Sequence, residues 1–237
     1  MCSIILGVEP GRFWLAANRD ELLARPARGP FWWHQGFLAG RDEQAGGTWL
    51  GLNQRGLAVG VTNRFGAQRH PERGSRGALV VDALAQPSVT ALHAWLGALS
   101  PGRCNAFHLV YADGARAGVT WSDGETLTQQ LLGPGLHVVT ERSYGAAEAE
   151  RATRLREALG GVPTRPEAST LQRLLAVHDE ANPLAASCVH LDAFGYGTRS
   201  SAILFPGERF LWAEGPPCVT PWQDLTGLLQ SASAPAS

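Results

Sequence analysis

The chain of 237 residues carries 20 basic and 21 acidic side chains, a formal net charge of −1, and 44% hydrophobic residues. Such a chain is long enough to bury a sizeable core, and it lacks the basic excess that would draw it to nucleic acid or to an anionic membrane. We therefore expect a single folded domain over residues 1–230, followed by a disordered Ala/Ser/Pro tail over residues 231–237.

The cysteines are few and widely spaced. There are four, at positions 2, 104, 188 and 218, with no Cys-x-x-Cys pair, and in a chain of this length they do not indicate a disulfide scaffold. The N-terminus has no basic segment followed by a long apolar one, and no apolar run approaches the roughly 18 residues of a membrane span. These features predict a cytoplasmic protein with reduced thiols and no integral membrane association.

The chain opens with two apolar runs, residues 2–6 and 13–17, on either side of a Pro-Gly turn signal. This pattern predicts a β-hairpin. Because a hairpin brings its two ends together, the Asn-Arg-Asp-Glu segment at residues 18–21 should lie near Cys2.

Cys2 is the first candidate for chemistry. Removal of an initiator methionine before this small residue would leave a cysteine whose α-amine, with an ordinary pKa of about 8, can accept the thiol proton. Arg19 could favour the thiolate or hold a substrate carboxylate, and Asp20 could orient the amine or pair with Arg19. The structural alternative is that Cys2 is a small buried hydrophobe and that the Arg and Asp form an ordinary ion pair.

The next segment, residues 22–33, contains two Pro dipeptides and the aromatic cluster Phe31-Trp32-Trp33, and it is predicted to be a loop. Its tryptophans either cover an edge of the core or form a wall that faces a substrate. Gly46-Gly47 lacks the spacing of a dinucleotide-binding motif, so it indicates a close backbone approach or a sharp bend. Residues 64–75 are rich in arginine and predict either a solvated loop or an anion-binding rim.

The rest of the chain alternates between helices and hairpins. Helices are predicted over residues 78–85, 90–99, 146–159 and 167–178, and strands over residues 45–51, 57–63, 105–111, 117–121, 136–139, 196–205 and 210–212. Since hairpins build antiparallel sheets, the pattern excludes a doubly wound parallel fold and favours an α+β arrangement with helices covering sheets.

Several other chemistries find no support. The seven histidines form no His-Glu-x-x-His motif and no ligand-spaced pair with cysteine, so we expect no metal site. The chain has no P-loop, no Gly-x-Ser-x-Gly elbow and no Cys-x-x-Cys-His motif for covalent haem. Noncovalent haem needs only a pocket and one His or Cys ligand, so haem stays open as a ligand, while no cofactor is required.

A set of short motifs runs along the chain: Met1-Cys2, Ala17–Glu21, Ala39–Asp42, Gly46–Gly51, Thr62-Asn63, Ser75–Gly77 and Tyr196–Ser201. Together they resemble the NRDE family, which is named for its Asn-Arg-Asp-Glu tetrapeptide and includes the transport and Golgi organisation two proteins. The resemblance extends over about residues 1–212. The family's chain start is similar in turn to N-terminal-nucleophile (Ntn) hydrolases with a cysteine nucleophile, such as choloylglycine hydrolase and penicillin V acylase, and to their acyl-CoA acyltransferase relatives.

This resemblance implies an α+β fold, namely a four-layer αββα sandwich of antiparallel sheets. It also implies that Cys2 attacks an acyl carbon with its own α-amine as the base, while Asp20 and Arg199 orient the amine and the substrate. The chain departs from the family where relatives carry an Asn, because it has Val-Thr-Glu at residues 139–141.

The oxyanion donor implied by the resemblance would therefore come from the backbone or from another side chain, Asn63 or Asn105.

Two functions follow as hypotheses. The first is a hydrolase or acyltransferase acting on an amide or an acyl-CoA-like thioester, with Cys2, Arg19, Asp20 and Arg199 as its catalytic residues. The second is a noncatalytic protein that binds and traffics haem, acyl-CoA or lipid, roles that the family resemblance implies. Its pocket would use the following side chains: Asn18, Trp32, Trp33, Trp49, Asn63 and Asn105, with Arg19 and Arg41 meeting propionates or phosphates.

Overall fold

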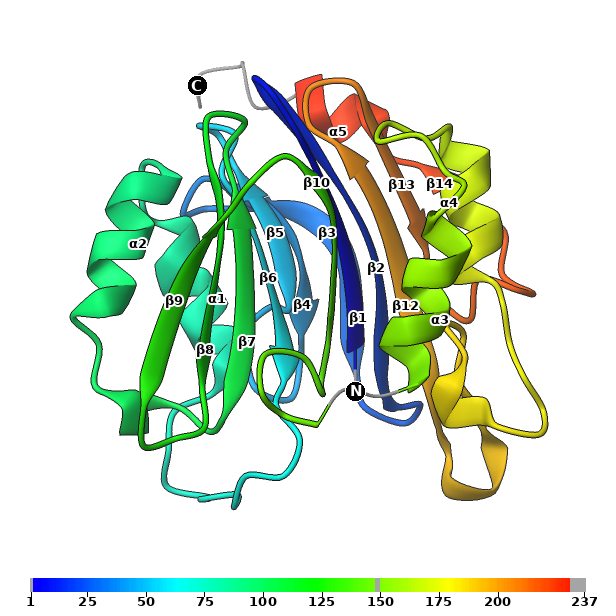
Figure 1. Ribbon diagram of the computed structural model, residues 1–237, viewed down its shortest axis with the longest axis horizontal. Coiled ribbons are helices and arrows are strands. Elements are labelled where there is room, and N and C mark those ends of the chain that lie inside the picture. Colours follow the sequence, from blue (N-terminus) through cyan, green and yellow to red (C-terminus); the bar gives the residue numbers. More distant parts are fainter. Residues whose placement is uncertain (1, 148–149, 231–237) are drawn as a thin grey trace.

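The computed structural model describes residues 2–147 and 150–230. Two antiparallel sheets form its centre (Figure 1). Sheet A runs in the order β10 (Gly135–Thr140), β1 (Cys2–Glu9), β2 (Arg12–Leu22), β12 (Tyr196–Phe205), β13 (Arg209–Ala213) and β14 (Gln223–Asp224), with β11 (His190–Leu191) paired to β12. Sheet B runs in the order β3 (Ala27–Trp33), β4 (Phe37–Asp42), β5 (Leu50–Asn53), β6 (Ala58–Asn63), β7 (Phe107–Ala112), β8 (Ala117–Ser122) and β9 (Leu127–Leu132).

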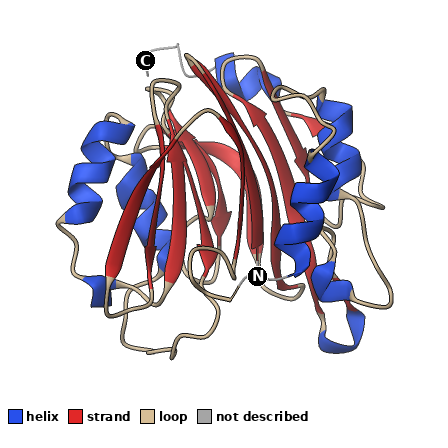
Figure 2. Ribbon diagram, in the orientation of Figure 1, coloured by secondary structure: helices blue, strands red, loops and turns tan. Residues whose placement is uncertain are grey.

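Helices cover the outer face of each sheet, as Figure 2 shows in blue on both sides of the red strands. On sheet B lie α1 (Arg76–Leu84) and α2 (Val89–Gly97), whose leucines pack with side chains of β6 and β7. On sheet A lie α3 (Glu150–Leu159) and α4 (Ala168–Leu175), which pack against Trp14 and Ile203. The short helix α5 (Thr226–Gln230) ends the described chain. The predicted αββα sandwich is therefore confirmed.

The core between the two sheets fixes which side chains of β1 face inward. Ile4 and Leu6 of sheet A belong to the same buried cluster as Leu50 and Val110 of sheet B. Side chains alternate along a strand, so Cys2 lies on the same inner face as Ile4 and Leu6. Position 2 thus comes at the end of the inter-sheet core, where a cavity can open beside it.

The opening hairpin is as predicted. β1 and β2 pair with Cys2 opposite Arg19, and the turn between them has Gly11 at a φ of +79°. The Gly-Gly pair also behaves as expected, because a Cβ on Gly47 would lie 2.4 Å from the carbonyl carbon of Gly77. Only glycine lets the backbone come this close to the start of α1.

Two predictions of local structure are wrong. The segment expected to be a loop is the edge strand β3, because Phe31, Trp32 and Trp33 favour an extended strand, and Gly29-Pro30 is accommodated where the pairing with β4 shifts register. Strand β9 was not predicted, since its sequence Leu-Thr-Gln-Gln-Leu-Leu is largely polar and partly exposed. The expected disordered tail and two positions of the helix predicted over 146–159, residues 148 and 149, lie outside the described residues.

We expect Gly7→Ala to destabilise the protein by about 1–3 kcal/mol, the usual cost of an overpacked core. A Cβ at this position would lie 2.2 Å from the indole of Trp14, which is fully buried and donates a hydrogen bond to the Thr164 carbonyl at 2.7 Å. Urea unfolding of the variant and the wild type measures the loss. Gly133→Ala is the matched control, because nothing lies within 4 Å of its Cβ. Equal free energies of unfolding for the two variants would contradict this packing argument.

Candidate active site

A cavity of about 430 Å³ opens at the end of the sandwich where β1 begins and where β2 and β6 end. Cys2, Arg19 and Asp20 line it, together with Trp49 and Asn63. The hairpin register brings the first three together, because Cys2 and Arg19 are directly paired and Asp20 follows. The structure thus gathers three of the four predicted catalytic residues around one cavity.

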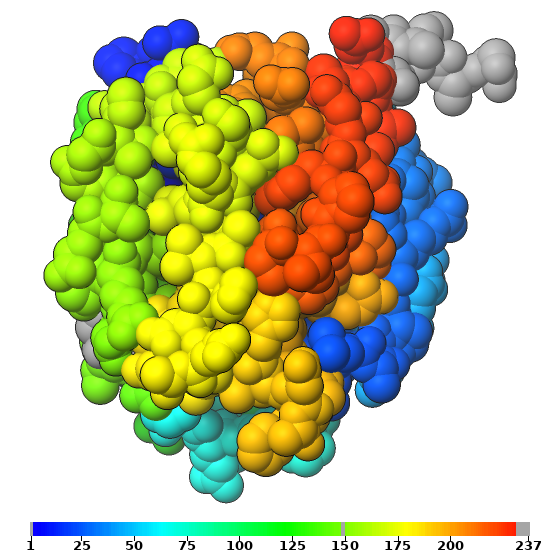
Figure 3. Space-filling model, turned by 90° about the vertical axis from the view of Figure 1, so that its right-hand side faces the viewer, coloured from blue at the N-terminus to red at the C-terminus, as the bar shows by residue number. Residues whose placement is uncertain are grey.

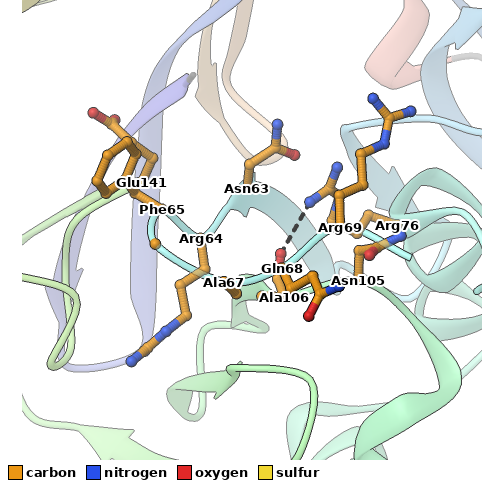
Figure 4. Close-up of a pocket in the computed structure, with 11 residues that line it drawn as sticks. Asn63, Arg64, Phe65, Ala67, Gln68, Arg69, Arg76, Asn105, Ala106 and Glu141 are labelled. Atoms are coloured by element: carbon orange, nitrogen blue, oxygen red, sulfur yellow. Dashed lines mark hydrogen bonds between the residues drawn. The ribbon is translucent and has the colours of Figure 1, made fainter. Parts of the chain in front are cut away.

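A second hollow of about 370 Å³ adjoins the first and shares four residues with it: Asn63, Arg69, Arg76 and Asn105. Its wall comes from the connection between β6 and α1 and from the segments around Asn105 and Glu141 (Figure 4). The arginine-rich loop of the sequence therefore forms part of the rim of both hollows.

Asp20 is the most firmly held charge at the site. Its Oδ2 accepts a hydrogen bond from Nη1 of Arg151 at 2.7 Å, and its Oδ1 accepts one from Oγ1 of Thr198 at 2.8 Å. The side chains of Asp20 and Arg151 are both 0% exposed. Although burial opposes it, the nearby carboxylates of Asp20 and Glu141 raise the pKa of Arg151. Arg151 therefore keeps its positive charge, and its contact fixes Asp20 in position beneath the cavity.

The pairing of β12 with β2 explains how Thr198 reaches Asp20. The two residues are opposite each other, and the register shifts between Thr198 and Ser200 through a β-bulge at Arg199. The Tyr196 hydroxyl, on the same strand, donates to the Asp20 carbonyl at 3.0 Å. A bulge re-aims side chains next to functional sites, and here it coincides with the strand that supports Asp20.

The thiol of Cys2 is 9% exposed. Burial raises its pKa, the Asp20 charge adds to this effect, and the Arg19 charge opposes it. A thiol in this environment holds its proton at neutral pH, so nucleophilic attack by Cys2 requires a base close by.

Arg19 lies beside Cys2 with part of its donor capacity unused. Its Nη2 is 3.8 Å from Glu21 and 3.7 Å from Asp42, while its buried Nη1 has no hydrogen-bond partner among the described residues. The Asp42 carboxylate pairs more closely with Arg25, which donates to it at 2.7 and 2.9 Å. An unpartnered guanidinium N–H at the cavity wall is a donor for a ligand oxygen.

The two candidate amide donors differ in how they are held. The Asn105 side chain accepts from the His70 backbone at 2.7 Å and donates to the His70 carbonyl at 2.8 Å, which commits it to the loop. Asn63 is exposed and lines both hollows, and in the described part of the chain its amide side chain makes no hydrogen bond. Glu141 lines only the second hollow.

Several predicted ligand-binding residues lie elsewhere. Asn18 is fully buried, and its amide donates to the carbonyls of Leu175 and Ser187 at 3.0 and 2.7 Å and accepts from Ser201 at 2.6 Å. These bonds tie β2 to α4 and β12, on the side of sheet A that faces the helices. Asn18 therefore supports the fold and does not reach the cavity.

The other residues that lie away from the cavity are a tryptophan pair and two arginines. Trp32 donates to the Leu228 carbonyl at 2.8 Å, and Trp33 stacks on Phe31 in the core beneath α1 and α2. Neither lines the Cys2 cavity.

Arg41 pairs with Glu43 on the surface, and Arg199 donates to Glu214 at 2.8 Å. Arg199, predicted to orient the substrate, is thus engaged outside the lining of the cavity.

Sequence reasoning missed Arg151, which makes the strongest contact to Asp20. One signal was available: Arg151 directly precedes the Ala152, Leu155 and Leu159 face of the helix, and all four side chains are buried. A charged side chain that is buried beside such an apolar face requires a partner of opposite charge. The sequence alone does not say which carboxylate that partner is.

The profile of the family described as Transport and Golgi organisation 2 matches residues 1–208 of the chain. The chain belongs to this family. The mouse and human Transport and Golgi organization 2 homologs are each 32% identical to it over 125 residues, which is 48% of this chain and 45% of each homolog. The aligned part thus spans less than half the length of these curated relatives.

Solved structures with a similar fold include an amidase ortholog, an acylase and a hydrolase. The N-acylethanolamine-hydrolyzing acid amidase ortholog of Caenorhabditis elegans has a TM-score of 0.60 and 14% identity, covering 87% of this chain and 93% of its own. Penicillin V acylase from Agrobacterium tumefaciens has a TM-score of 0.51 and 14% identity, covering 97% and 88%. A conjugated bile acid hydrolase from Clostridium perfringens has a TM-score of 0.52 and 11% identity, covering 96% and 93%. These likenesses establish an Ntn-hydrolase fold.

Among the described helices, none is long and apolar enough to cross a membrane.

The buried pair under the cavity predicts a contrast between two neighbouring arginines of α3. Arg151→Met removes the buried guanidinium that pairs with Asp20, and we expect a loss of about 3–5 kcal/mol in the free energy of unfolding. Arg154→Met removes an exposed pair with Glu150 and Asp179 and should cost less than about 1 kcal/mol. Chemical denaturation measures both, and a cost for Arg151→Met as small as that of its neighbour would overturn the assigned role.

His108 makes the support of the β6 end sensitive to pH. It is fully buried, its Nε2 donates to the Ser143 carbonyl at 2.7 Å, and the Thr62 hydroxyl lies 3.3 Å from its Nδ1. Burial lowers its pKa to about 4, below the value of about 6.5 in an unfolded chain. The neutral ring therefore stabilises the fold above pH 6.5, and this stability is lost as the pH falls towards 4.

We expect this loss to reach about 3 kcal/mol between pH 7.5 and pH 4, relative to His108→Gln, which does not titrate there. Unfolding free energies of both proteins across this range test the expectation. His34→Gln, at an exposed position, is the control and should follow the wild type. A wild-type-minus-variant difference that stays constant with pH would show that His108 does not carry the effect.

Proposed function

We propose that this protein is an Ntn-type cysteine hydrolase or acyltransferase that acts on an amide or an acyl-CoA-like thioester. The observation that carries the proposal is the meeting of Cys2, Arg19 and Asp20 at one cavity, with Asp20 held by Arg151 and Thr198. Packing alone does not account for a thiol and an incompletely paired guanidinium side by side at a cavity wall. The structural neighbours, which include an acid amidase ortholog and a penicillin V acylase, support the same class of reaction.

In the proposed reaction, the residue before Cys2 is removed and the α-amine of Cys2 becomes the base. The amine takes the thiol proton, and the thiolate sulfur forms a bond to the acyl carbon. The C–N or C–S bond of the substrate then breaks, and the leaving amine or thiol takes the proton from the α-ammonium. Water or an acceptor nucleophile attacks the acyl-enzyme thioester, releases the acyl group and restores the thiol.

The neighbouring residues supply orientation and charge. Asp20, which Arg151 and Thr198 hold in place, orients the α-amine of Cys2. Nη1 of Arg19 binds a substrate oxygen, because no described group occupies it. The Asn63 amide, free of hydrogen bonds to the described residues and at the cavity wall, is the better side-chain donor for the developing oxyanion, since Asn105 is committed to His70.

A second function, binding of haem or acyl-CoA without turnover, has one specific observation in its favour. Arg69 and Arg76 line both hollows, and neither forms an ion pair within the described ranges 2–147 and 150–230. In the part of the chain that the structure describes, the Arg76 side chain donates to the Ala106 carbonyl at 3.0 Å and to no other group (Figure 4). Unpaired guanidinium groups at a cavity rim suit the phosphates of CoA or the propionates of haem. The raised pKa of Cys2 is also typical of a buried thiol that has no catalytic role.

Intact-mass spectrometry with p-nitrophenyl acetate as an acylating probe tests the enzymatic proposal. The wild type should lack the residue before Cys2 and gain one acetyl group, because the α-amine can deprotonate the thiol. Cys2→Ala should gain none, while Cys104→Ala should behave as the wild type, since Cys104 is a buried thiol outside the cavity lining.

Retention of the preceding residue together with the absence of a Cys2-dependent adduct would overturn the enzymatic reading. Titration with haem and with a nonhydrolysable acyl-CoA analogue, each against Arg76→Ala, would then examine the binding function.

A further inference from the structure

Far from Cys2 along the chain, the fold gathers two thiols and two imidazoles. The Sγ atom of Cys218 lies 3.6 Å from that of Cys188 and 3.1 Å from Nε2 of His190, and Cys188 Sγ lies 3.4 Å from the same nitrogen. The His178 ring lies edge-on to that of His190, with centroids 5.5 Å apart. Ligand atoms of His178, His190 and Cys218 all lie within 4.8 Å of one another.

These four residues come from three separate segments. His178 follows α4, Cys188 and His190 flank Val189 at the start of β11, and Cys218 lies in the segment between β13 and β14. Figure 3 shows the yellow segment around residue 178 lying against the red-orange segment after β13 on the outer face of sheet A. None of the four lines the Cys2 cavity, so the cluster is a site of its own.

The spacing of the ligand atoms matches the edges of a zinc tetrahedron. With Zn–S bonds of about 2.3 Å and Zn–N bonds of about 2.0–2.1 Å, tetrahedral geometry requires about 3.8 Å between two sulfurs and about 3.6 Å between sulfur and nitrogen. The separations of 3.6, 3.4 and 3.1 Å among Cys188, His190 and Cys218 lie within about half an ångström of these values. The ligand atoms of Cys188, His190 and Cys218 therefore already surround one point. The exposed His178 has a ring nitrogen within 4.8 Å of ligand atoms of His190 and Cys218, so a movement of this side chain would bring it to the fourth position.

We propose that His178, Cys188, His190 and Cys218 form a Zn²⁺ site of the Cys₂His₂ type. Thiolate and imidazole ligands select zinc over the oxygen-seeking Mg²⁺ and Ca²⁺. Four protein ligands fill the coordination shell, so the metal has a structural role. We expected no metal site because the histidines show no known ligand spacing with cysteine; the fold brings these ligands together from separate segments, Cys188 and Cys218 being 30 positions apart along the chain.

The site would clamp the segment that supports Asp20. Val189, between two of the ligands, donates to Oγ1 of Thr198 at 2.8 Å and accepts from the Thr198 backbone N–H at 2.9 Å. Thr198 in turn donates to Asp20. A zinc ion would tie β11 to the segments around His178 and Cys218, and it would thereby hold this chain of hydrogen bonds from outside.

Metal analysis of the full-length protein, purified without a metal-affinity tag and in the presence of reductant, tests the proposal. We expect about one Zn²⁺ per chain by mass spectrometry of the elements, and Co²⁺ in its place should give the intense visible bands of a tetrahedral thiolate site. Cys218→Ser and His178→Asn, at positions that are not fully buried, should each weaken Zn²⁺ binding by more than about 100-fold. This threshold separates a ligand from a residue that only supports one, because losing a supporting contact costs at most about 100-fold in metal affinity.

Cys104→Ser is the matched control, because it removes a buried thiol that lies outside the cluster, and it should keep the metal. Absence of bound Zn²⁺ in the reduced protein, even after equimolar Zn²⁺ is added, would overturn the proposal. A disulfide between Cys188 and Cys218 that persists under reducing conditions would overturn it as well. Zinc bound equally by the wild type and by Cys218→Ser would assign the metal to other residues.

Discussion

The buried ion pair between Asp20 and Arg151 is the interaction on which the site depends. Removing two charges from water is costly, and the cost is offset only when both are paired and their remaining polar atoms are hydrogen-bonded. Here the 2.7 Å contact to Arg151 and the 2.8 Å contact to Thr198 satisfy both carboxylate oxygens of Asp20, and Nε of Arg151 donates to the Leu184 carbonyl at 3.1 Å. Of the polar atoms of the pair, Nη2 of Arg151 has no hydrogen-bond partner among the described residues. The pair therefore fixes α3, β2 and β12 relative to one another, and Cys2 lies against this fixed frame.

The alternation of side chains along β2 divides the work between the two faces of sheet A. Arg19 faces the cavity between the sheets, whereas the carboxylate of Asp20 and the amide of Asn18 bond to groups on the helical side. Within the Asn-Arg-Asp-Glu motif, Arg19 can thus contact a ligand while the next residue, Asp20, anchors the strand. This division explains why a tetrapeptide with such polar composition lies in a buried strand: three of its side chains are buried, and Asn18 and Asp20 have hydrogen-bond partners on both of their polar atoms.

Local patterns predicted the parts of this protein that local physics determines. The first hairpin, the close approach of Gly47, the helices and the association of Cys2 with Arg19 and Asp20 all follow from periodicity, turn residues or strand pairing. Contacts between distant segments did not follow, because pairing of Arg151 with Asp20 spans 131 residues and leaves no spacing to read. The prediction for the edge strand β3 failed for another reason, because Gly29 and Pro30 signal a turn while a position at a sheet edge tolerates them.

The proposed catalytic and binding functions need the same architecture, and they differ in whether the proton of the Cys2 thiol can be removed. Both proposed functions use the same cavity and the same support beneath Asp20, with Arg19 binding the substrate in the first and Arg69 and Arg76 binding the ligand in the second. Burial keeps the Cys2 thiol protonated, and the surrounding side chains do not offset this, because Arg19 lowers the pKa of the thiol while Asp20 raises it. Neither His70 nor any other described histidine is hydrogen-bonded to this thiol, although His70 lines the same cavity. In the proposed reaction the base is the backbone nitrogen of Cys2 itself, so turnover would depend on whether that nitrogen is an amine or part of a peptide bond.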